Sequence, residues 1–229
     1  NLLQQLYNVA DTLIVGRFLG SDALGAVGSS YTLMTFLTSI LLGLCMGSGA
    51  LFAACWGQRD LARLRRQTHA AFVLIAVCTV VLNAAAFLLL DAMKTLLSVP
   101  AEVWPLMRSY LFVIFFGIGG TFLYNYYASL LRAVGNSLVP LLFLAAAAVL
   151  NIALDLVFVL VCRWGVEGAA AATVLAQWLS GIGTAVYTLV RCPELRARRE
   201  ERRITGAMLR ELLSASVLTC LQQSVMNLG

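Results

Sequence analysis

Charged residues are scarce in this sequence of 229 residues, and histidine is nearly absent. Asp, Glu, Lys and Arg together make up 12% of the chain, whereas soluble domains carry roughly 25%. The single histidine, His69, and the lack of an HExxH or GxSxG pattern argue against an enzyme, which would need a metal cluster or a nucleophile beside a base. We therefore expect neither enzymatic activity nor a cofactor.

Cysteine pairs at short spacing are also lacking. The six cysteines follow no CxxC pattern and most lie inside apolar runs, where a cysteine behaves as a small hydrophobic residue. Neither a disulfide framework nor a cysteine metal site is predicted. The first apolar run has no basic segment before it, so it is not typical of a cleavable signal peptide.

Long apolar runs are what the sequence has in abundance. Hydrophobic residues make up 61% of the chain and the mean hydropathy is +0.88. Runs poor in charge, each longer than the roughly 20 residues that cross a bilayer core, occupy 23–58, 70–90, 109–131, 133–154 and 168–190. With the opening segment and another from about 206, these runs predict an all-α integral membrane protein with six spans and part of a seventh. A soluble protein would need most of its helices to be apolar all round.

The ends of the sequence suggest part of a longer, repeated protein. The sequence begins almost directly with a span and stops inside another at Gly229, and residues 221–224 resemble residues 3–6. Transporters are often built from repeated bundles. We therefore expect a six-helix lobe at 1–190, a basic linker at 191–205 and the start of a second lobe, with a truncated seventh span, at 206–229.

Positive charge gathers in every second connection between the spans. The arginines that follow the second, fourth and sixth spans are 59, 63, 65 and 66, then 132, then 191, 196, 198, 199, 202 and 203. By the positive-inside rule this alternation predicts that the N-terminus and loops 2–3, 4–5 and 6–7 are cytoplasmic. The run 196–203 could instead indicate binding to nucleic acid or anionic lipid, but topology explains it more simply, and we expect no nucleic-acid partner.

Asp11 places a carboxylate in the middle of the first span. A charged Asp there costs roughly 2.5–3.5 kcal/mol on insertion scales, so such a residue usually faces a bundle interior or an aqueous cavity and marks a functional site. Gln4, Asn8 and Asp11 stand at i, i+4 and i+7, which makes a polar stripe on one helix face with Tyr7 beside it.

The fifth span offers Asp11 a partner. Asn151 and Asp155 are spaced i, i+4 and share a helix face. Together with Asp11 they would form an oxygen-rich cluster suited to a proton or to a monovalent cation. Two alternatives stay open: Asp155 could merely cap the end of its helix, and Thr173, in the sixth span, could bond only its own helix backbone.

Several other residues of the spans are candidates for a cavity wall. Tyrosines near the ends of spans usually belong to an interface belt, which for Tyr126 and Tyr127 is at least as good an interpretation as cavity lining. The candidates for a substrate cleft are Gln4, Tyr7, Asn8, Tyr124 and Gln177.

Motifs in order along the chain resemble one family. They are Tyr-Asn-Val-Ala-Asp-Thr-Leu-Ile-Val-Gly at 7–16, Gly-Ser-Asp-Ala-Leu-Gly-Ala-Val-Gly at 20–28, Gly-Gln at 57–58, Leu-Arg-Ala-Val-Gly-Asn at 131–136, Pro140 and Asn-Ile-Ala-Leu-Asp at 151–155. The sequence is similar to the N-terminal lobe of a bacterial multidrug and toxic compound extrusion (MATE) transporter, and the similarity covers essentially the whole chain.

The resemblance implies a protein of twelve helices, in two six-helix lobes around a central cleft, in the cytoplasmic membrane. It implies export of organic, often cationic, compounds in exchange for H⁺ or Na⁺. The cation site would comprise Asp11, Asn151, Asp155 and Thr173, the first three being Na⁺ ligands if Na⁺ is the coupling ion. We expect a monomer in contact with lipid and a cleft lined by apolar and aromatic side chains. The alternative is a lipid-linked oligosaccharide flippase, which should line its cavity with several arginines, whereas the charges inside these spans are acidic.

Overall fold

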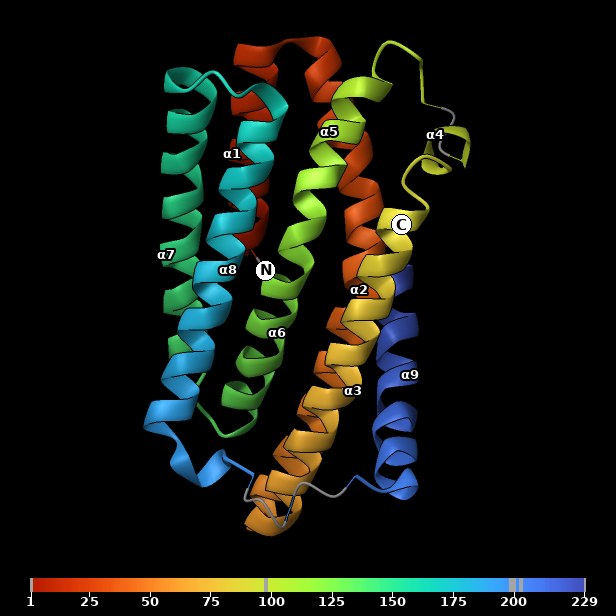
Figure 1. Cartoon of the computed structure of the whole chain (residues 1–229). Coiled ribbons are helices and arrows are strands. Elements are labelled where there is room, and N and C mark those ends of the chain that lie inside the picture. Colours follow the sequence, from red (N-terminus) through yellow and green to blue (C-terminus); the bar gives the residue numbers. More distant parts are fainter. Residues whose placement is uncertain (1, 97–98, 198–200, 202–203, 229) are drawn as a thin grey trace.

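The computed structural model describes residues 2–96, 99–197, 201 and 204–228, and their regular structure is helical throughout. The long helices run side by side in one elongated bundle (Figure 1). The elements are α1 (Leu2–Leu19), α2 (Ser21–Gly57), α3 (Leu61–Leu88), α4 (Met93–Leu96), α5 (Trp104–Ile114), the 3₁₀ turn η1 (Phe115–Gly117), α6 (Ile118–Ala133), α7 (Leu138–Asp155), the π-helical η2 (Leu156–Val161), α8 (Gly165–Arg191), the 3₁₀ turn η3 (Pro193–Leu195) and α9 (Gly206–Leu228).

Five helical segments among the described residues are long and apolar enough to cross a membrane. They are Ser21–Gly57, Leu61–Leu88, Trp104–Ala133, Leu138–Val161 and Gly165–Arg191. The helix α1 falls outside this set, since its 18 residues include two glutamines, an asparagine, Asp11 and Arg17. Large apolar side chains such as Val80 on α3 and Val149 on α7 are mostly exposed, as lipid-facing side chains would be. The prediction of an all-α, multi-pass membrane protein is confirmed.

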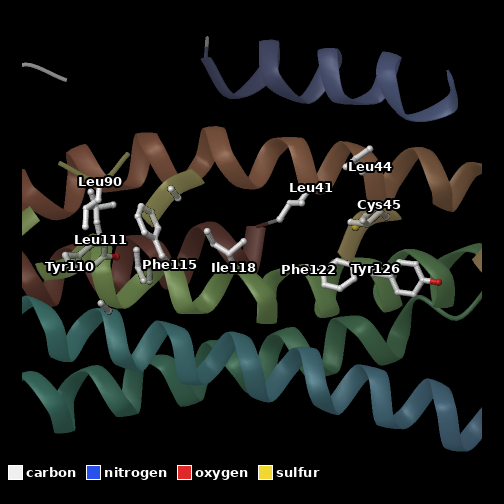
Figure 2. Close-up of a cluster of buried hydrophobic side chains, with 14 of the residues drawn as sticks. Leu41, Leu44, Cys45, Leu90, Tyr110, Leu111, Phe115, Ile118, Phe122 and Tyr126 are labelled. Atoms are coloured by element: carbon white, nitrogen blue, oxygen red, sulfur yellow. The ribbon is translucent and has the colours of Figure 1, made fainter. Parts of the chain in front are cut away.

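The core lies between α2 and the continuous segment formed by α5, η1 and α6. Leu41 and Cys45 of α2 face Phe115, Ile118 and Phe122 across this interior (Figure 2). These side chains are all at most 5% exposed, so the segment from α5 to α6 forms one side of the buried core.

Tyr126 is part of this core rather than of an interface belt. It is 3% exposed and donates a hydrogen bond of 2.6 Å from its hydroxyl to the backbone carbonyl of Thr68 on α3. Its ring also packs edge-on against Phe52 and Phe72. Tyr126 therefore joins α6 to both α2 and α3.

The connections between the helices lie at the two ends of the bundle, and the arginine-rich connections share one end. The turns α2–α3 and α6–α7 and the connection from α8 to α9 lie together at the lower end of Figure 1, while α1–α2, α3–α5 and α7–α8 turn at the upper end. The lower end, called the basic end below, carries the described arginines 59, 63, 65, 66, 132, 191 and 196. Residues 198–200 and 202–203 of the arginine run lie outside the described part.

The helix α9 packs along α2 near the basic end (Figure 1). A methyl group added at Gly47 of α2 would lie 2.5 Å from the Cα of Ser216, so glycine permits this close approach of two helices. Glu211 of α9 pairs with Arg63 Nη2 at 2.6 Å and accepts a hydrogen bond of 2.7 Å from the amide of Gln67. Close backbone packing and polar side-chain contacts together attach α9 to α2 and α3.

Candidate functional site

Asp11 lies on the wall of a large cavity inside the bundle. The cavity has a volume of about 930 Å³ and is lined from α1, α2, α5, α6, α7 and α8. Asp11 is only 7% exposed, and its Oδ1 has no hydrogen-bond partner among the described residues. A largely buried carboxyl group thus lies on the wall of the cavity.

Asn151 and Thr173 join α7 to α8 next to this cavity. The amide Nδ2 of Asn151 donates a hydrogen bond of 3.2 Å to Thr173 Oγ1. Asn151 is 1% exposed and Thr173 8%, and the amide oxygen of Asn151 remains without a partner. The structure therefore brings these two predicted residues together through the donor of the amide and leaves its acceptor free.

Asp155 follows Asn151 one turn later and is completely buried. Neither of its carboxylate oxygens has a hydrogen-bond partner, so the interpretation of Asp155 as a backbone cap is not supported. The helix α1, which carries Asp11, packs against α7, which ends at Asp155. The α-helix also ends at Asp155 and continues as the π-helical η2, where Cys162 N bonds Val157 O at 2.9 Å. Short π-helical segments occur often at functional sites.

The donor set of this cluster is made of oxygen atoms. Two carboxylates, the amide oxygen of Asn151 and the hydroxyl of Thr173 are supplied by α1, α7 and α8, which pack against one another. No group of three His, Cys, Asp or Glu side chains suited to a metal ion occurs among the described residues. Buried carboxylates without partners are costly, and a proton or a hard monovalent cation compensates that cost, so the residues fit either ion.

The cavity wall is more polar than predicted. Its lining includes Met and Leu side chains and three tyrosines, as expected, but hydroxyl and amide side chains are as prominent: Thr12, Thr35, Thr38, Ser39, Thr121, Asn125, Ser129, Ser137, Thr173 and Gln177. The prediction of an apolar and aromatic cleft was therefore only half right. A cavity of this volume and mixed lining suits a drug-sized molecule.

A second cavity of about 40 Å³ branches from the first toward Asn151. The two share Thr121, Tyr124, Asn125, Leu144, Thr173 and Gln177 as lining residues. Such a volume can hold a water molecule if polar partners are present. Thr121 Oγ1 and Gln177 Oε1 are both buried and unbonded, so two further oxygens stand near this branch.

The candidates for the substrate cleft divide into two groups. Tyr124 and Gln177 line both cavities, and the hydroxyl of Tyr124 donates a hydrogen bond of 3.1 Å to the backbone carbonyl of Pro140. The side chains of Gln4, Tyr7 and Asn8 lie outside the described part of the chain, although their backbone belongs to α1.

Two polar stripes on the cavity wall were not predicted from the sequence. On α2, Tyr31, Thr35, Thr38 and Ser39 repeat at helical spacing and all line the cavity. On α6, the residues 121, 125, 129 and 132 do the same, ending in Arg132. Polar residues at i, i+4, i+8 and i+11 in an apolar helix were the available signal. Arg132 also corrects the expectation that the charges within the spans are all acidic, since its side chain contributes to the wall.

A helical membrane bundle with two buried acids on neighbouring helices, one of them on the wall of a large cavity, is typical of a transporter, and the family comparison agrees. The family model MatE matches residues 1–157, and the chain belongs to this family. A solved structure titled the inward-facing conformation of a multidrug resistance MATE family transporter of the MOP superfamily superposes with a TM-score of 0.91. It is 24% identical in sequence and covers 98% of this chain and 51% of that one, which establishes the fold.

Curated relatives carry two kinds of name. The probable multidrug resistance protein YpnP of Bacillus subtilis is 34% identical over 189 residues, which is 82% of this chain and 42% of that protein. The FAD transporter of Shewanella oneidensis is 24% identical over 188 residues, 80% of this chain and 41% of that protein. The chain thus spans about half the length of the curated relatives that it matches.

Proposed function

We propose that this chain forms the cation-binding lobe of an antiporter that exports small organic compounds, often cationic, in exchange for H⁺ or Na⁺. The observation that carries the proposal is a pair of buried acids on neighbouring helices. Asp11 lines the cavity of about 930 Å³, and its Oδ1 and both carboxylate oxygens of Asp155 lack hydrogen-bond partners among the described residues. Relatives named as multidrug resistance proteins support the class of substrate. The protein would act as a monomer in contact with lipid, without a cofactor and without enzymatic chemistry.

Asp11 and Asp155 would couple cation entry to substrate export, because their buried carboxylates are stable only with a bound proton or cation. Without a bound cation, the buried carboxylates of Asp11 and Asp155 would be poorly solvated, which favours binding of a proton or of Na⁺. In the Na⁺ case the ligands would be Asp11, Asn151 and Asp155, with the hydroxyl of Thr173 orienting Asn151. A bound cation shifts the conformational equilibrium by its different affinity for the two states. Cation entry and substrate release would thereby be linked.

The membrane potential would help to drive export. Inward movement of one positive charge gains about 2.3 kcal/mol per 100 mV. The direction follows if the basic end faces the cytoplasm, which the positive-inside rule favours. Grouping of the α2–α3, α6–α7 and α8–α9 connections at that end supports this sidedness and a place in the cytoplasmic membrane (Figure 1).

The flippase alternative receives less support from the cavity. Such a protein should present several arginines to a lipid-linked pyrophosphate, and Arg132 is the one arginine or lysine among the described lining residues of the large cavity. A single guanidinium fits a smaller anionic group better than a lipid-linked oligosaccharide. We therefore favour export of soluble organic compounds.

Efflux from liposomes tests the proposal. The full-length protein would be reconstituted with a cationic dye inside, and efflux followed under an imposed pH gradient and then under a Na⁺ gradient. Wild type would be compared with Asp11→Asn and Asp155→Asn, which keep shape but remove the charge. Glu167→Gln serves as the matched control, because Glu167 is an exposed acid in the first turn of α8.

Loss of gradient-driven efflux in both Asn variants, with Glu167→Gln unaffected, would establish antiport through this acid pair and identify the coupling ion. Efflux that survives both substitutions would overturn the cation site. If wild type moved no dye under either gradient, the flippase alternative would gain weight, and lipid-linked substrates would be tried next.

A further inference from the structure

Arg132 stands at the basic end of the same cavity that Asp11 lines. It belongs to the last turn of α6, and its side chain is exposed on the cavity wall together with Ser129 and Ser137. The guanidinium donates one hydrogen bond, from Nη2 to Ser129 Oγ at 3.2 Å. No carboxylate among the described residues pairs with it, although three other arginines of the described chain have acidic partners.

The surroundings of Arg132 are rich in neutral hydroxyl groups. Tyr124 lines the cavity from the same helix two turns earlier. Ser129 and Ser137 add two hydroxyls to the wall. A guanidinium has five N–H donors in a planar fork that matches a carboxylate or phosphate, and most of these donors have no partner among the residues that the structure describes. Such a site is complementary to an anionic group.

The cavity is therefore bipolar along its length. Arg132 follows Thr121 by eleven residues on α6, which at 1.5 Å per residue separates them by about 16 Å. Thr121 shares the small branch cavity with Asn151 and Thr173 of the cation cluster. A guanidinium thus lies at the basic end, and the carboxyl group of Asp11 lies on the wall of the same cavity. An elongated molecule with an anionic end fits this arrangement.

We propose that Arg132 is an anion-accepting subsite of the substrate cavity, which binds the carboxylate or phosphate of a substrate whose remaining part extends toward Asp11. This inference rests on the proposed transport function and specifies its substrates: zwitterionic aromatic amines and compounds that carry a phosphate, beside purely cationic drugs. The competing explanation is that Arg132 serves only as one of the cytoplasmic charges that orient the protein in the membrane.

Equilibrium binding to the full-length protein in nanodiscs of neutral lipid separates the two explanations. The probes are two pairs of fluorescent compounds that differ by one anionic group: rhodamine 110 with its methyl ester, rhodamine 123, and flavin mononucleotide with riboflavin. The variants are Arg132→Gln, Arg132→Lys and the control Arg66→Gln. Arg66 is an exposed arginine of the basic end that does not line the cavity, and its Nε bonds the carbonyl of Ala62 on its own helix.

Arg132→Gln is expected to weaken binding of the anionic member of each pair by roughly tenfold, the typical effect of a hydrogen bond to a charged group, and to leave the neutralised or ester member unchanged. Arg132→Lys should restore part of the loss, because it keeps the charge but not the fork. Arg66→Gln should match wild type. Equal weakening of both members, no weakening at all, an equal effect of Arg66→Gln, or failure of wild type to bind either anionic probe would overturn the proposal.

A second set of nanodiscs containing phosphatidylglycerol identifies the source of the anion. If the headgroup of a lipid occupies Arg132, binding of flavin mononucleotide to wild type falls in these discs and binding to Arg132→Gln does not. If both kinds of disc give the same affinity, the subsite takes soluble anions. Because binding at equilibrium needs no ion gradient, a wild-type protein that discriminates the pairs but shows no gradient-driven efflux would contradict only the coupling mechanism.

Discussion

The side-chain amide of Asn151 donates a hydrogen bond to the hydroxyl of Thr173, whereas its amide oxygen accepts none from the described residues. The Nδ2–Oγ1 distance is 3.2 Å, both side chains are buried, and Asn151 Oδ1 has no partner in the structure. Since an unbonded buried acceptor costs free energy, this arrangement orients the oxygen for a ligand rather than for the protein. In the proposed cation site, the hydroxyl of Thr173 would therefore position a ligand atom.

Thr173→Val should weaken binding of the coupling cation. The substitution removes the acceptor that holds Asn151, and loss of one neutral hydrogen bond of about 1 kcal/mol corresponds to about a fivefold higher cation concentration for half-maximal efflux. Thr173→Ser should retain the wild-type value. Titration of dye efflux against Na⁺ or pH measures the effect.

Thr184→Val is the matched control for that titration. Thr184 is a fully buried threonine of the same helix whose hydroxyl bonds only its own backbone, at the carbonyl of Ser180. An equal shift for the two valine variants would mean that Thr173 acts only through the stability of α8.

Gly47→Ala should loosen the attachment of α9. The added methyl group would meet the Cα of Ser216 at 2.5 Å and the backbone oxygen of Ala215 at 2.8 Å, so the two helices must move apart. We expect a loss of about 1–3 kcal/mol of stability, as for other overpacked positions, measured by thermal unfolding of the purified full-length protein.

Gly25→Ala, on the same helix, tests whether the contact rather than the glycine is decisive. Nothing lies within 4 Å of a methyl group added there, so the variant should be neutral or more stable by about 0.5–1 kcal/mol. A Gly47→Ala protein as stable as Gly25→Ala would show that α9 does not approach α2 this closely.

The Arg63–Glu211 pair should show a small but measurable coupling energy. The side chains are 43% and 36% exposed, so solvent screens the pair and about 0.2–1 kcal/mol is expected. A double-mutant cycle with Arg63→Ala and Glu211→Ala, read by thermal unfolding, measures it. The more exposed pair Arg108–Asp91, at 51% and 74%, should give no measurable coupling, and a zero value for both pairs would refute a stabilising role of Glu211.

The two acids of the site could be predicted from the sequence, because the free-energy cost of an Asp within an apolar run depends on the neighbouring sequence alone. An Asp in an apolar run is unusual wherever it stands, and the i, i+4 spacing of Asn151 and Asp155 is enough to assign both to one helix face. The helical spans could also be predicted from a local property, which is the length of each apolar run. The hydrogen bond of Thr173 could not be predicted, since nothing in the sequence chooses between a backbone carbonyl and an amide on another helix.

The rest of the site depends on which helices are neighbours. The polar stripe of α2 was visible as spacing, but only the packing of α2 opposite α6, α7 and α8 makes it a cavity wall. The π-helical turn after Asp155 lies in an uninterrupted apolar sequence that gives no local signal. Arg132 was interpreted from its place in a cytoplasmic turn, whereas its side chain also reaches the cavity, and no count of charges per loop can reveal that.

The fastening of α9 to α2 has a consequence for how the protein is made. The hydrogen bond from Ser216 to the carbonyl of Leu44 joins residues 172 positions apart, and the bond between Arg63 and Glu211 joins residues 148 apart. When the ribosome has inserted α2 and α3, the partner of their shared face has not yet been synthesised. Until α9 is inserted and packs against α2 and α3, lipid or the insertion machinery would therefore cover Gly47 and the buried amide of Gln67.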